Sequence, residues 1–294
     1  MTAELSTDVI VGGRRAAAGG RATFAALAAR ETRRFVLNPV FLAAAALTAF
    51  FLWSGQRSTI TAIEDVNAIA AVCFGGLGMM AAFGLTRSMH ASEPVVGVTP
   101  VTRPARTAAL CATAIVPFGC GCLTLLAFLQ LIPVSSALYG AFSPSARIAV
   151  LIGQIVMPAL GGPLLGVALG RWVRFPGAAF VLFLVLYGWV SLVTIVTMAY
   201  PDSAPIAVLR LFSPFAFYTL HADVGGVSAW RGSPWFFIGW QLALCAIAVL
   251  VALLRGAEGP VRARIIRALA IAGAAALILL VLAGAGGFTH AVTT

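Results

Sequence analysis

Residues that could do chemistry are few in this chain of 294 residues, and they stand apart from one another. His221 and Asp223 are two positions apart with no third ligand near them in the sequence, so they do not indicate a metal site. Cys120 and Cys122 are also two apart, and on a helix such side chains point roughly 200° away from each other. The spaced motifs of zinc proteases and serine hydrolases are absent. We therefore predict no catalytic site, no metal and no cofactor in this chain.

Three amides within or beside apolar segments, Asn67, Gln130 and Gln154, are the remaining polar candidates. Amides in apolar helices commonly form hydrogen bonds between helices, so a structural role is the simpler interpretation. The alternative is that they line a translocation path through the membrane. No Asp, Glu or Arg lies well inside an apolar segment, and this speaks against an ion-coupled carrier.

Composition predicts the fold class. The chain is 61% hydrophobic and only 10% charged, and apolar runs recur that are close to the roughly 20 residues a helix needs to cross a membrane. Backbone polar groups in lipid must be satisfied internally, which favours helices. We predict an all-α polytopic membrane protein with six to seven transmembrane helices and an N-terminal amphipathic interfacial helix. The expected order is a flexible tail 1–20, the amphipathic helix 21–38, a transmembrane domain 39–288 with spans 39–54, 66–86, 107–132, 148–170, 176–200, 234–254 and 268–288, and a tail 289–294.

Arginine distribution predicts the orientation. All 19 basic residues are arginine, and the absence of lysine excludes a P-loop in this chain. With the N-terminus in the cytoplasm, the cytoplasmic segments hold six, three, two and four arginines, and the external segments hold the other four. This asymmetry fits the positive-inside rule, so the formal charge of +10 is assigned to topology and not to nucleic-acid binding. We expect a bacterial plasma-membrane protein without a cleavable signal peptide; its C-terminus lies outside if all seven segments span, and inside if one is re-entrant.

The segment 21–37 forms a basic amphipathic helix when projected at 100° per residue. Glu31 lies in the middle of the apolar face, where a carboxylate is unfavourable unless it is paired. Its partner is either Arg34, three residues on, or a basic residue of a neighbouring loop. The helix itself is either a lipid anchor or a partner site. The apolar face comprises Phe24, Leu27, Ala28 and Phe35, and the basic face Arg30, Arg33 and Arg34.

The segment between the second and third spans contains TPVTRPART, residues 99–107. Pro100 and Pro104 fix their own φ angles and restrict the preceding residues, so the segment is stiff. Arg103 and Arg106 can bind carboxylates in bidentate fashion. On these properties alone, the segment is either a contact for an acidic partner surface or a positively charged loop with turn prolines.

The fourth span carries Gly162, Gly166 and Gly170 at four-residue spacing, which gives a smooth face for close helix packing. The neighbour is either another helix of this chain or a second copy. Pro158 is expected to kink this helix. The external segment 201–233 is apolar and aromatic, and short interfacial helices are expected there.

The order of these features resembles the permease subunit of the second class of bacterial ATP-binding-cassette exporters, the drug- and antibiotic-export type. Thr99–Arg103 is similar to the TPVSR part of that family's linker, and Glu93 resembles its acidic residue, displaced by one position. SPF at Ser213–Phe215 lies where the family has external short helices. The resemblance covers most of residues 20–255, and the seventh segment departs from the family's usual six spans.

The resemblance implies that this chain pairs with an identical or paralogous permease, while a separate subunit binds ATP and Mg²⁺ and hydrolyses the nucleotide. It implies export of a hydrophobic or amphipathic compound that the sequence does not specify. The alternatives are a membrane enzyme or assembly factor without an ATPase and, last, an ion-coupled carrier. The implied ATPase-coupling contacts are Arg30, Glu31, Arg33, Arg34, Glu93, Thr99, Pro100, Arg103 and Arg106.

Overall fold

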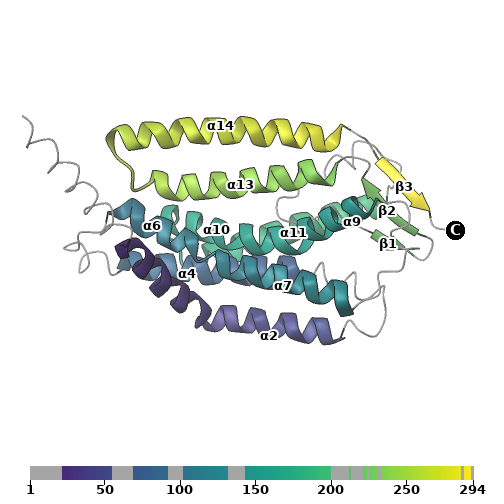
Figure 1. The fold of residues 1–294 in the computed structure, drawn as a ribbon, viewed down its shortest axis with the longest axis horizontal. Helices are drawn as coiled ribbons and strands as arrows, with labels where there is room; N and C mark the ends of the chain where they lie inside the picture. The colour runs from purple at the N-terminus through teal and green to yellow at the C-terminus, as the bar shows by residue number, and fades with distance from the viewer. Residues whose placement is uncertain are drawn as a thin grey trace, which may run out of the picture.

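The structure is a computed structural model of the chain, and it describes residues 22–54, 69–91, 102–131, 143–199, 212, 221–223, 226–230, 233–285 and 288–292. Long helices run along the major axis of the molecule, and the chain passes back and forth between its two ends (Figure 1). The N-terminal helix Ala22–Val36 lies at one end, and the described chain finishes at the other. Asn67, Glu93, Thr99 and Pro100 lie outside the described residues, as does the N-terminal tail 1–20.

Helices make up almost all of the described chain. They are α2 (Pro39–Ser54), η2 (Ile69–Leu77), α4 (Gly78–Ala91), α6 (Arg103–Ala112), α7 (Ile115–Leu131), α9 (Pro144–Leu151), η3 (Ile152–Val156), α10 (Met157–Trp172), α11 (Ala178–Ala199), α13 (Pro234–Leu254) and α14 (Gly259–Gly284). Of these, η2 and η3 are π-helical, and η3 joins α9 to α10 in one continuous helical segment.

Several helices begin where a proline follows a polar residue. At the start of α2, the Asn38 side-chain oxygen accepts a hydrogen bond from the N–H of Val40 at 2.9 Å. At the start of α6, the Thr102 hydroxyl accepts from the N–H of Ala105 at 3.4 Å. These side chains satisfy donors that have no partner within the first turn, and proline has no N–H there to satisfy. The break at Asn38 and Pro39 also separates the N-terminal helix from α2, and the axes of these two helices differ in direction by 60°.

The core of the molecule forms around α10, which is buried along most of its length. It packs against η2 and α4 on one side and α13 on another, with α6, α7 and α11 also in contact. By contrast, α14 packs mainly on α13 and is exposed along nearly all of its length. The central helix therefore carries the contacts that join both halves of the bundle.

The π-helical turn η3 stands directly before Pro158, where the sequence predicts a kink. An α-helix would pair the N–H of residue 158 with the carbonyl of Gln154, but proline has no N–H. The N–H of Met157 instead bonds the carbonyl of Ile152, five residues back. The irregularity therefore takes the form of a widened turn, a feature that is frequent at functional sites.

A small antiparallel sheet departs from the all-helical prediction. Strand β1 (His221–Asp223) pairs with β2 (Gly226–Trp230), and β2 pairs with β3 (Phe288–Val292). The described part of the segment expected to form short helices thus contains two strands, which are joined by a strand from the end of the chain. Figure 1 shows the sheet at the end of the bundle opposite the N-terminal helix.

The predicted spans agree with the helices at α2 and α13 and differ at α6 and α14. Helix α6 begins at Arg103, four residues before the expected span at 107, and α14 begins at Gly259, nine before the expected 268. Apolarity marks the lipid-facing length of a helix, whereas caps decide where the helix begins. Arg103 and Arg106 therefore lie on the first turns of a helix and not in a linker.

Several described helices could cross a membrane by length and composition, as predicted. They are Val72–Met89, Arg103–Gln130, Pro144–Trp172, Pro234–Leu254 and Gly259–Gly284, and the bent pair Ala22–Val36 with Pro39–Ser54 makes a sixth if it is one broken span. The apolar segment Ala178–Val193 of α11 is shorter. Large apolar side chains are exposed on the outer helices, including Leu184 and Val185 of α11 and Ile271 and Leu277 of α14. Such a surface suits lipid better than water.

Candidate functional site

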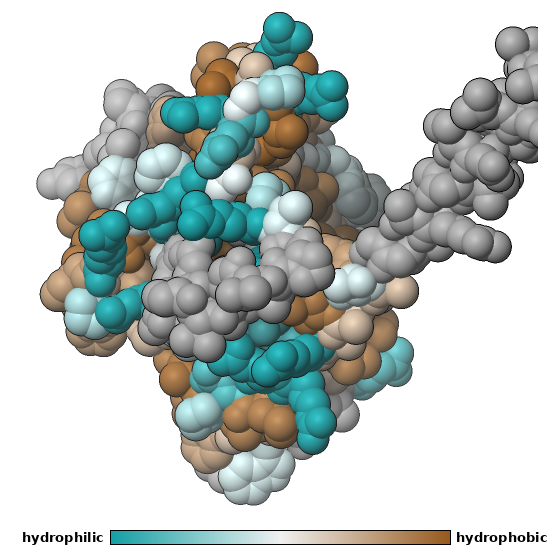
Figure 2. All heavy atoms as spheres, turned by 90° about the vertical axis from the view of Figure 1, so that its left-hand side faces the viewer, coloured by the Kyte–Doolittle hydropathy of each residue, from teal (hydrophilic) through white to brown (hydrophobic). Residues whose placement is uncertain are grey.

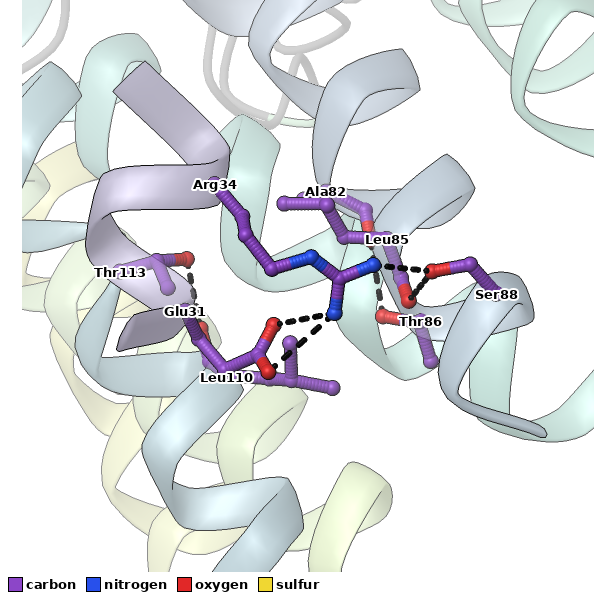
Figure 3. Close-up of polar contacts among 8 residues, drawn as sticks. All are labelled: Glu31, Arg34, Ala82, Leu85, Thr86, Ser88, Leu110 and Thr113. Atoms are coloured by element: carbon purple, nitrogen blue, oxygen red, sulfur yellow. Dashed lines mark hydrogen bonds and ion pairs between the residues drawn. The ribbon is translucent and has the colours of Figure 1, made fainter. Parts of the chain in front are cut away.

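One arginine of the N-terminal helix forms an ion pair within that helix and a hydrogen bond to α4 (Figure 3). Arg34 Nη1 lies 3.1 Å from Glu31 Oε2 and 3.3 Å from Oε1, and Arg34 Nη2 donates to Ser88 Oγ at 3.1 Å. The Ser88 hydroxyl in turn donates to the carbonyl of Leu85 at 2.8 Å. The structure thus shows the local pair, one of the two alternatives for Glu31, and adds a contact to α4.

The Glu31 carboxylate lies in a largely apolar setting. The Glu31 side chain is 8% exposed, whereas that of Arg34 is 43% exposed. Phe35, one turn further along, is fully buried and belongs to the same apolar cluster as Leu85 of α4 and Leu110 of α6. A buried carboxylate is unfavourable without a charged partner, so Arg34 has the task of neutralising Glu31 from the solvent side. The N-terminal helix is therefore a packed part of the bundle and not only a surface anchor.

The start of α6 meets two other helix ends. A Cβ placed on Gly256, in the turn between α13 and α14, would lie 3.3 Å from the Cβ of Arg103 and 3.2 Å from Nη2 of Arg171. Within α6 itself, the Thr107 hydroxyl donates to the Arg103 carbonyl at 3.1 Å. The first turn of α6, the last turn of α10 and the α13–α14 turn are therefore in contact.

A second set of contacts joins the ends of α10 and α13. The indole N–H of Trp172 donates to the Val251 carbonyl at 2.9 Å. The Arg255 guanidinium stands over the Trp172 ring, 5.6 Å from its centroid, which is the distance range of a cation–π interaction. Arg171 beside it is buried, with 4% of its surface exposed. The predicted fourth span ended at residue 170, so the burial of Arg171 was not expected.

These helix ends form one arginine-rich end of the molecule. Figure 2 views it directly and shows hydrophilic side chains gathered across it. Arg30 and Arg33 are exposed on the N-terminal helix, Arg103 is exposed on α6, and Arg106 is partly buried. The predicted coupling residues that the structure describes therefore lie on one face of the molecule, although they come from separate segments of the sequence.

The glycine face of α10 packs against η2 and α4 of the same chain. A Cβ on Gly162 would overlap the Gly75 backbone, and one on Gly166 would overlap the Met79 carbonyl. A Cβ on Gly170 would lie 2.8 Å from the Cβ of Thr86. Of the two neighbours considered for this glycine face, the structure shows a helix of the same chain, the second predicted span. The backbones approach so closely that any side chain would separate them.

The predicted translocation-path residues do not form one buried group in the described chain. Gln154 is buried in η3, with 1% of its surface exposed, whereas Gln130 is exposed near the end of α7. A third glutamine, Gln241 of α13, is fully buried and was overlooked in the sequence. The available signal was simple, because it is the one strongly polar residue within the apolar helix Pro234–Leu254.

Among the described residues, no three His, Cys, Asp or Glu side chains are grouped so as to hold a metal ion. Cys120 and Cys122 lie on α7 as free thiols, and the three other cysteines, which lie on η2, α6 and α13, are free thiols as well.

Comparison with known proteins gave no match. No protein-family model, no curated protein and no solved structure matches the chain. The site must therefore be interpreted from its own residues.

Proposed function

We propose that this chain is the membrane-spanning subunit of an ATP-binding-cassette exporter for a hydrophobic or amphipathic compound. ATP and Mg²⁺ bind a separate subunit, which docks on the arginine-rich end. That end faces the cytoplasm of a bacterium, and the chain works in the plasma membrane as a dimer with an identical or paralogous permease. The family resemblance of the sequence suggests this assignment.

The observation that carries the proposal is the convergence of two segments at one end of the bundle. The N-terminal helix and α6 are separated by more than sixty residues of sequence, yet Phe35 and Leu110, near the end of α6, belong to one apolar cluster. Both segments expose arginines at this end. An ATPase subunit that presents acidic groups would engage both at once, since arginine binds carboxylates in bidentate fashion.

The packing supports transmission of a movement away from this end. Arg34 connects the N-terminal helix to Ser88 at the end of α4. Helix α4 and η2 are in turn locked against α10 by Gly162 and Gly166, with backbone against backbone. Coupling between distant sites needs rigid elements that move together. In this proposal, closure of the ATPase subunits displaces the N-terminal helix and α6, and α4 with α10 follows as a unit.

Co-purification tests the proposal. The proposal predicts that an ATP-binding-cassette ATPase is encoded beside this chain. The chain, with an affinity tag, is expressed with that ATPase, and the two are isolated together in mild detergent. We expect a stable complex for the wild type and at least a tenfold lower yield of the partner for the double variant Arg103→Glu/Arg106→Glu. The matched control is Arg262→Glu/Arg264→Glu, which reverses two exposed arginines of α14 at the same end.

The control separates docking from general electrostatics. If both double variants release the partner equally, the attraction is a diffuse charge effect and the α6 contact is not specific. If the wild type retains no ATP-binding subunit, the proposed function is wrong. Normal membrane insertion of every variant is checked by its yield in the membrane fraction.

A further inference from the structure

Arg255 and Trp172 form an exposed pair at the ends of α13 and α10. The indole N–H of Trp172 donates to the Val251 carbonyl at 2.9 Å, which fixes the ring against the last turn of α13. The Arg255 guanidinium lies over that ring, 5.6 Å from its centroid, while Trp172 is still 48% exposed. The pair is therefore held in place by the protein and remains open to molecules outside it.

The surroundings of this pair carry positive charge that few carboxylates of the chain can balance. The segments 171–178 and 251–267 contain six arginines and one carboxylate, that of Glu258. Arg174 and Arg255 are both exposed, and within the described structure neither of them forms an ion pair. An anionic partner from outside the chain is therefore favoured, because a guanidinium binds a phosphate or carboxylate group through two parallel hydrogen bonds.

The lengths of α13 and α14 place this pair at the level of lipid headgroups. Helix α13 has 21 residues, which rise about 32 Å, and this matches the roughly 30 Å of a membrane's hydrocarbon core. Arg255 directly follows Leu254, the last residue of α13. Helix α14 has 26 residues and is about 39 Å long, so its first turns, with Arg262 and Arg264, extend beyond the hydrocarbon. A bilayer that covers the apolar lengths of both helices therefore has its phosphate groups beside Arg255.

Exposed aromatic rings beside the arginines distinguish between a lipid and an acidic protein as the partner. Phe175, which follows Arg174 in the chain, is 58% exposed, and the Trp172 ring is exposed under Arg255. An acidic protein surface would pair with the guanidinium groups but offer the rings only polar contacts. A phospholipid supplies a phosphate group and an acyl chain together, and tryptophan is enriched at the membrane–water boundary because its ring suits both surroundings. The combination therefore favours a lipid.

We propose that Arg255 and Trp172, together with Arg174 and Phe175, form a binding site for an anionic phospholipid. The phosphate group of the lipid accepts hydrogen bonds from the Arg255 guanidinium, which the Trp172 ring holds in position. Arg174 adds a second positive charge. The upper part of the acyl chains lies against the exposed rings of Trp172 and Phe175. Basic sites between transmembrane helices are suited to anionic headgroups for these reasons.

This site does not depend on the proposed ATP-driven export. It requires only that α13 and α14 cross a membrane, and its test requires neither an ATPase subunit nor transport. Within an exporter, a bound phospholipid would hold the ends of α10 and α13 at a constant depth in the membrane while other helices move.

Native mass spectrometry of the full chain tests the site. The chain in mild detergent is incubated with equal amounts of phosphatidylglycerol, which is anionic, and phosphatidylcholine, which has no net charge, and the bound lipids are counted. We expect the wild type to retain phosphatidylglycerol preferentially. Arg255→Met should lower that preference by roughly tenfold, the effect of losing one hydrogen bond to a charged group. The matched control is Arg87→Met, because Arg87 also lies over an aromatic ring, 5.9 Å from the centroid of Phe83, but that ring is buried.

Three outcomes would overturn the proposal. Equal retention of the two lipids by the wild type would show that binding is unspecific, and an equal loss in Arg255→Met and Arg87→Met would show a diffuse charge effect. Glycerol phosphate, a headgroup without acyl chains, is added as a competitor; we expect it to leave the lipid bound, and full displacement at equal concentration would show a site for soluble phosphate instead. If Arg255→Met keeps the lipid preference, the proposal is wrong, and release of a co-purified ATPase subunit by the same variant would assign the arginine to protein docking.

Quenching of Trp172 fluorescence in bilayers gives an independent test. The chain has six tryptophans, and subtracting the emission of Trp172→Phe from that of the wild type isolates Trp172. Phosphatidylcholine vesicles contain a small fraction of either brominated phosphatidylglycerol or brominated phosphatidylcholine, with bromine near the headgroup end of the acyl chains. We expect stronger quenching by the brominated phosphatidylglycerol and loss of this difference in Arg255→Met. Equal quenching of Trp172 by the two brominated lipids in the wild type would contradict the proposal.

Discussion

Replacing Gly166 with alanine is expected to force α10 away from α4. The added Cβ would overlap the Met79 carbonyl oxygen and lie 3.0 Å from the carbonyl carbon and Cα of the same residue. All three atoms belong to the backbone, so no side chain can rotate to make room. The helices must separate, and the close contacts at Gly162 and Gly170 loosen with them.

The magnitude follows from two opposing effects. Overpacking a tight interface costs about 1–3 kcal/mol, while replacing glycine by alanine inside a helix favours the helix by up to about 1 kcal/mol. We expect Gly166→Ala to lower the free energy of unfolding by about 1–2 kcal/mol. The matched control is Gly84→Ala in α4, because a Cβ there meets no atom within 4 Å. It should leave stability unchanged or raise it by up to about 1 kcal/mol.

Equilibrium unfolding in mixed micelles of mild detergent and dodecyl sulfate measures both variants. The difference between them isolates the packing effect, since the change of residue type is the same. If Gly166→Ala is as stable as Gly84→Ala, the backbone contact between α10 and α4 is absent, and the route for transmitting movement fails with it.

Two further substitutions test the ends of the helices. Arg34→Met leaves the Glu31 carboxylate largely buried without its partner, and because solvent reaches the exposed side of the pair we expect it to lower the free energy of unfolding by about 1–2 kcal/mol. The double variant with Glu31→Gln should recover more than half of that loss, and no recovery would show that the pair is not coupled. Gly259→Ala places a side chain at φ +53°, where alanine is strained by about 1 kcal/mol, whereas Gly273→Ala, which meets no atom within 4 Å, should be neutral or stabilising. Thermal melting of the four variants in one detergent measures these effects. Equal melting temperatures for Gly259→Ala and Gly273→Ala would contradict the prediction of strain at Gly259.

The sequence predicted the ends of α2 and α13 well because proline marks both starts. Pro39 and Pro234 are the first residues of their helices. At α6 and α14, the prediction failed because arginines lie on the first turns. Hydropathy identifies the part of a helix that suits lipid, and a helix continues beyond that part wherever its cap allows.

The glycine spacing on α10 predicted a close contact, but one sequence cannot say which element fills it. Gly75 and Met79 lie on η2 and α4, 87 residues before Gly162 and Gly166 respectively, and only the three-dimensional packing brings them together. The π-helical turns were not predictable by periodicity: an extra residue in one turn rotates the following residues by about 100°, but in segments that are apolar on nearly all sides this shift of phase leaves no mark in the sequence. The pairing of β2 with β3 was not predictable either, because the two strands are far apart in the sequence.

Within the candidate site, the sequence predicted which residues are buried better than which residues contact each other. The amphipathic pattern put Glu31 on the apolar face of the N-terminal helix, and in the structure the residue is buried there. Its link to Ser88 depends on how α4 passes the helix, which no local pattern contains. Gln241 shows the opposite failure: its type and position were visible in an apolar helix, but the packing of α13 on η3 was needed to show that neither polar atom of its amide has a hydrogen-bond partner within the described structure.

ATP hydrolysis by the reconstituted complex tests the central claim most directly. The chain and the ATPase predicted to be encoded beside it are placed together in bilayer discs, and phosphate release is measured with and without the chain. We predict that the wild-type chain changes the hydrolysis rate at least several-fold, that Arg103→Glu/Arg106→Glu abolishes this effect, and that Arg262→Glu/Arg264→Glu preserves it. An ATPase rate that is the same with the wild-type chain, the α6 variant and no chain at all would contradict the account.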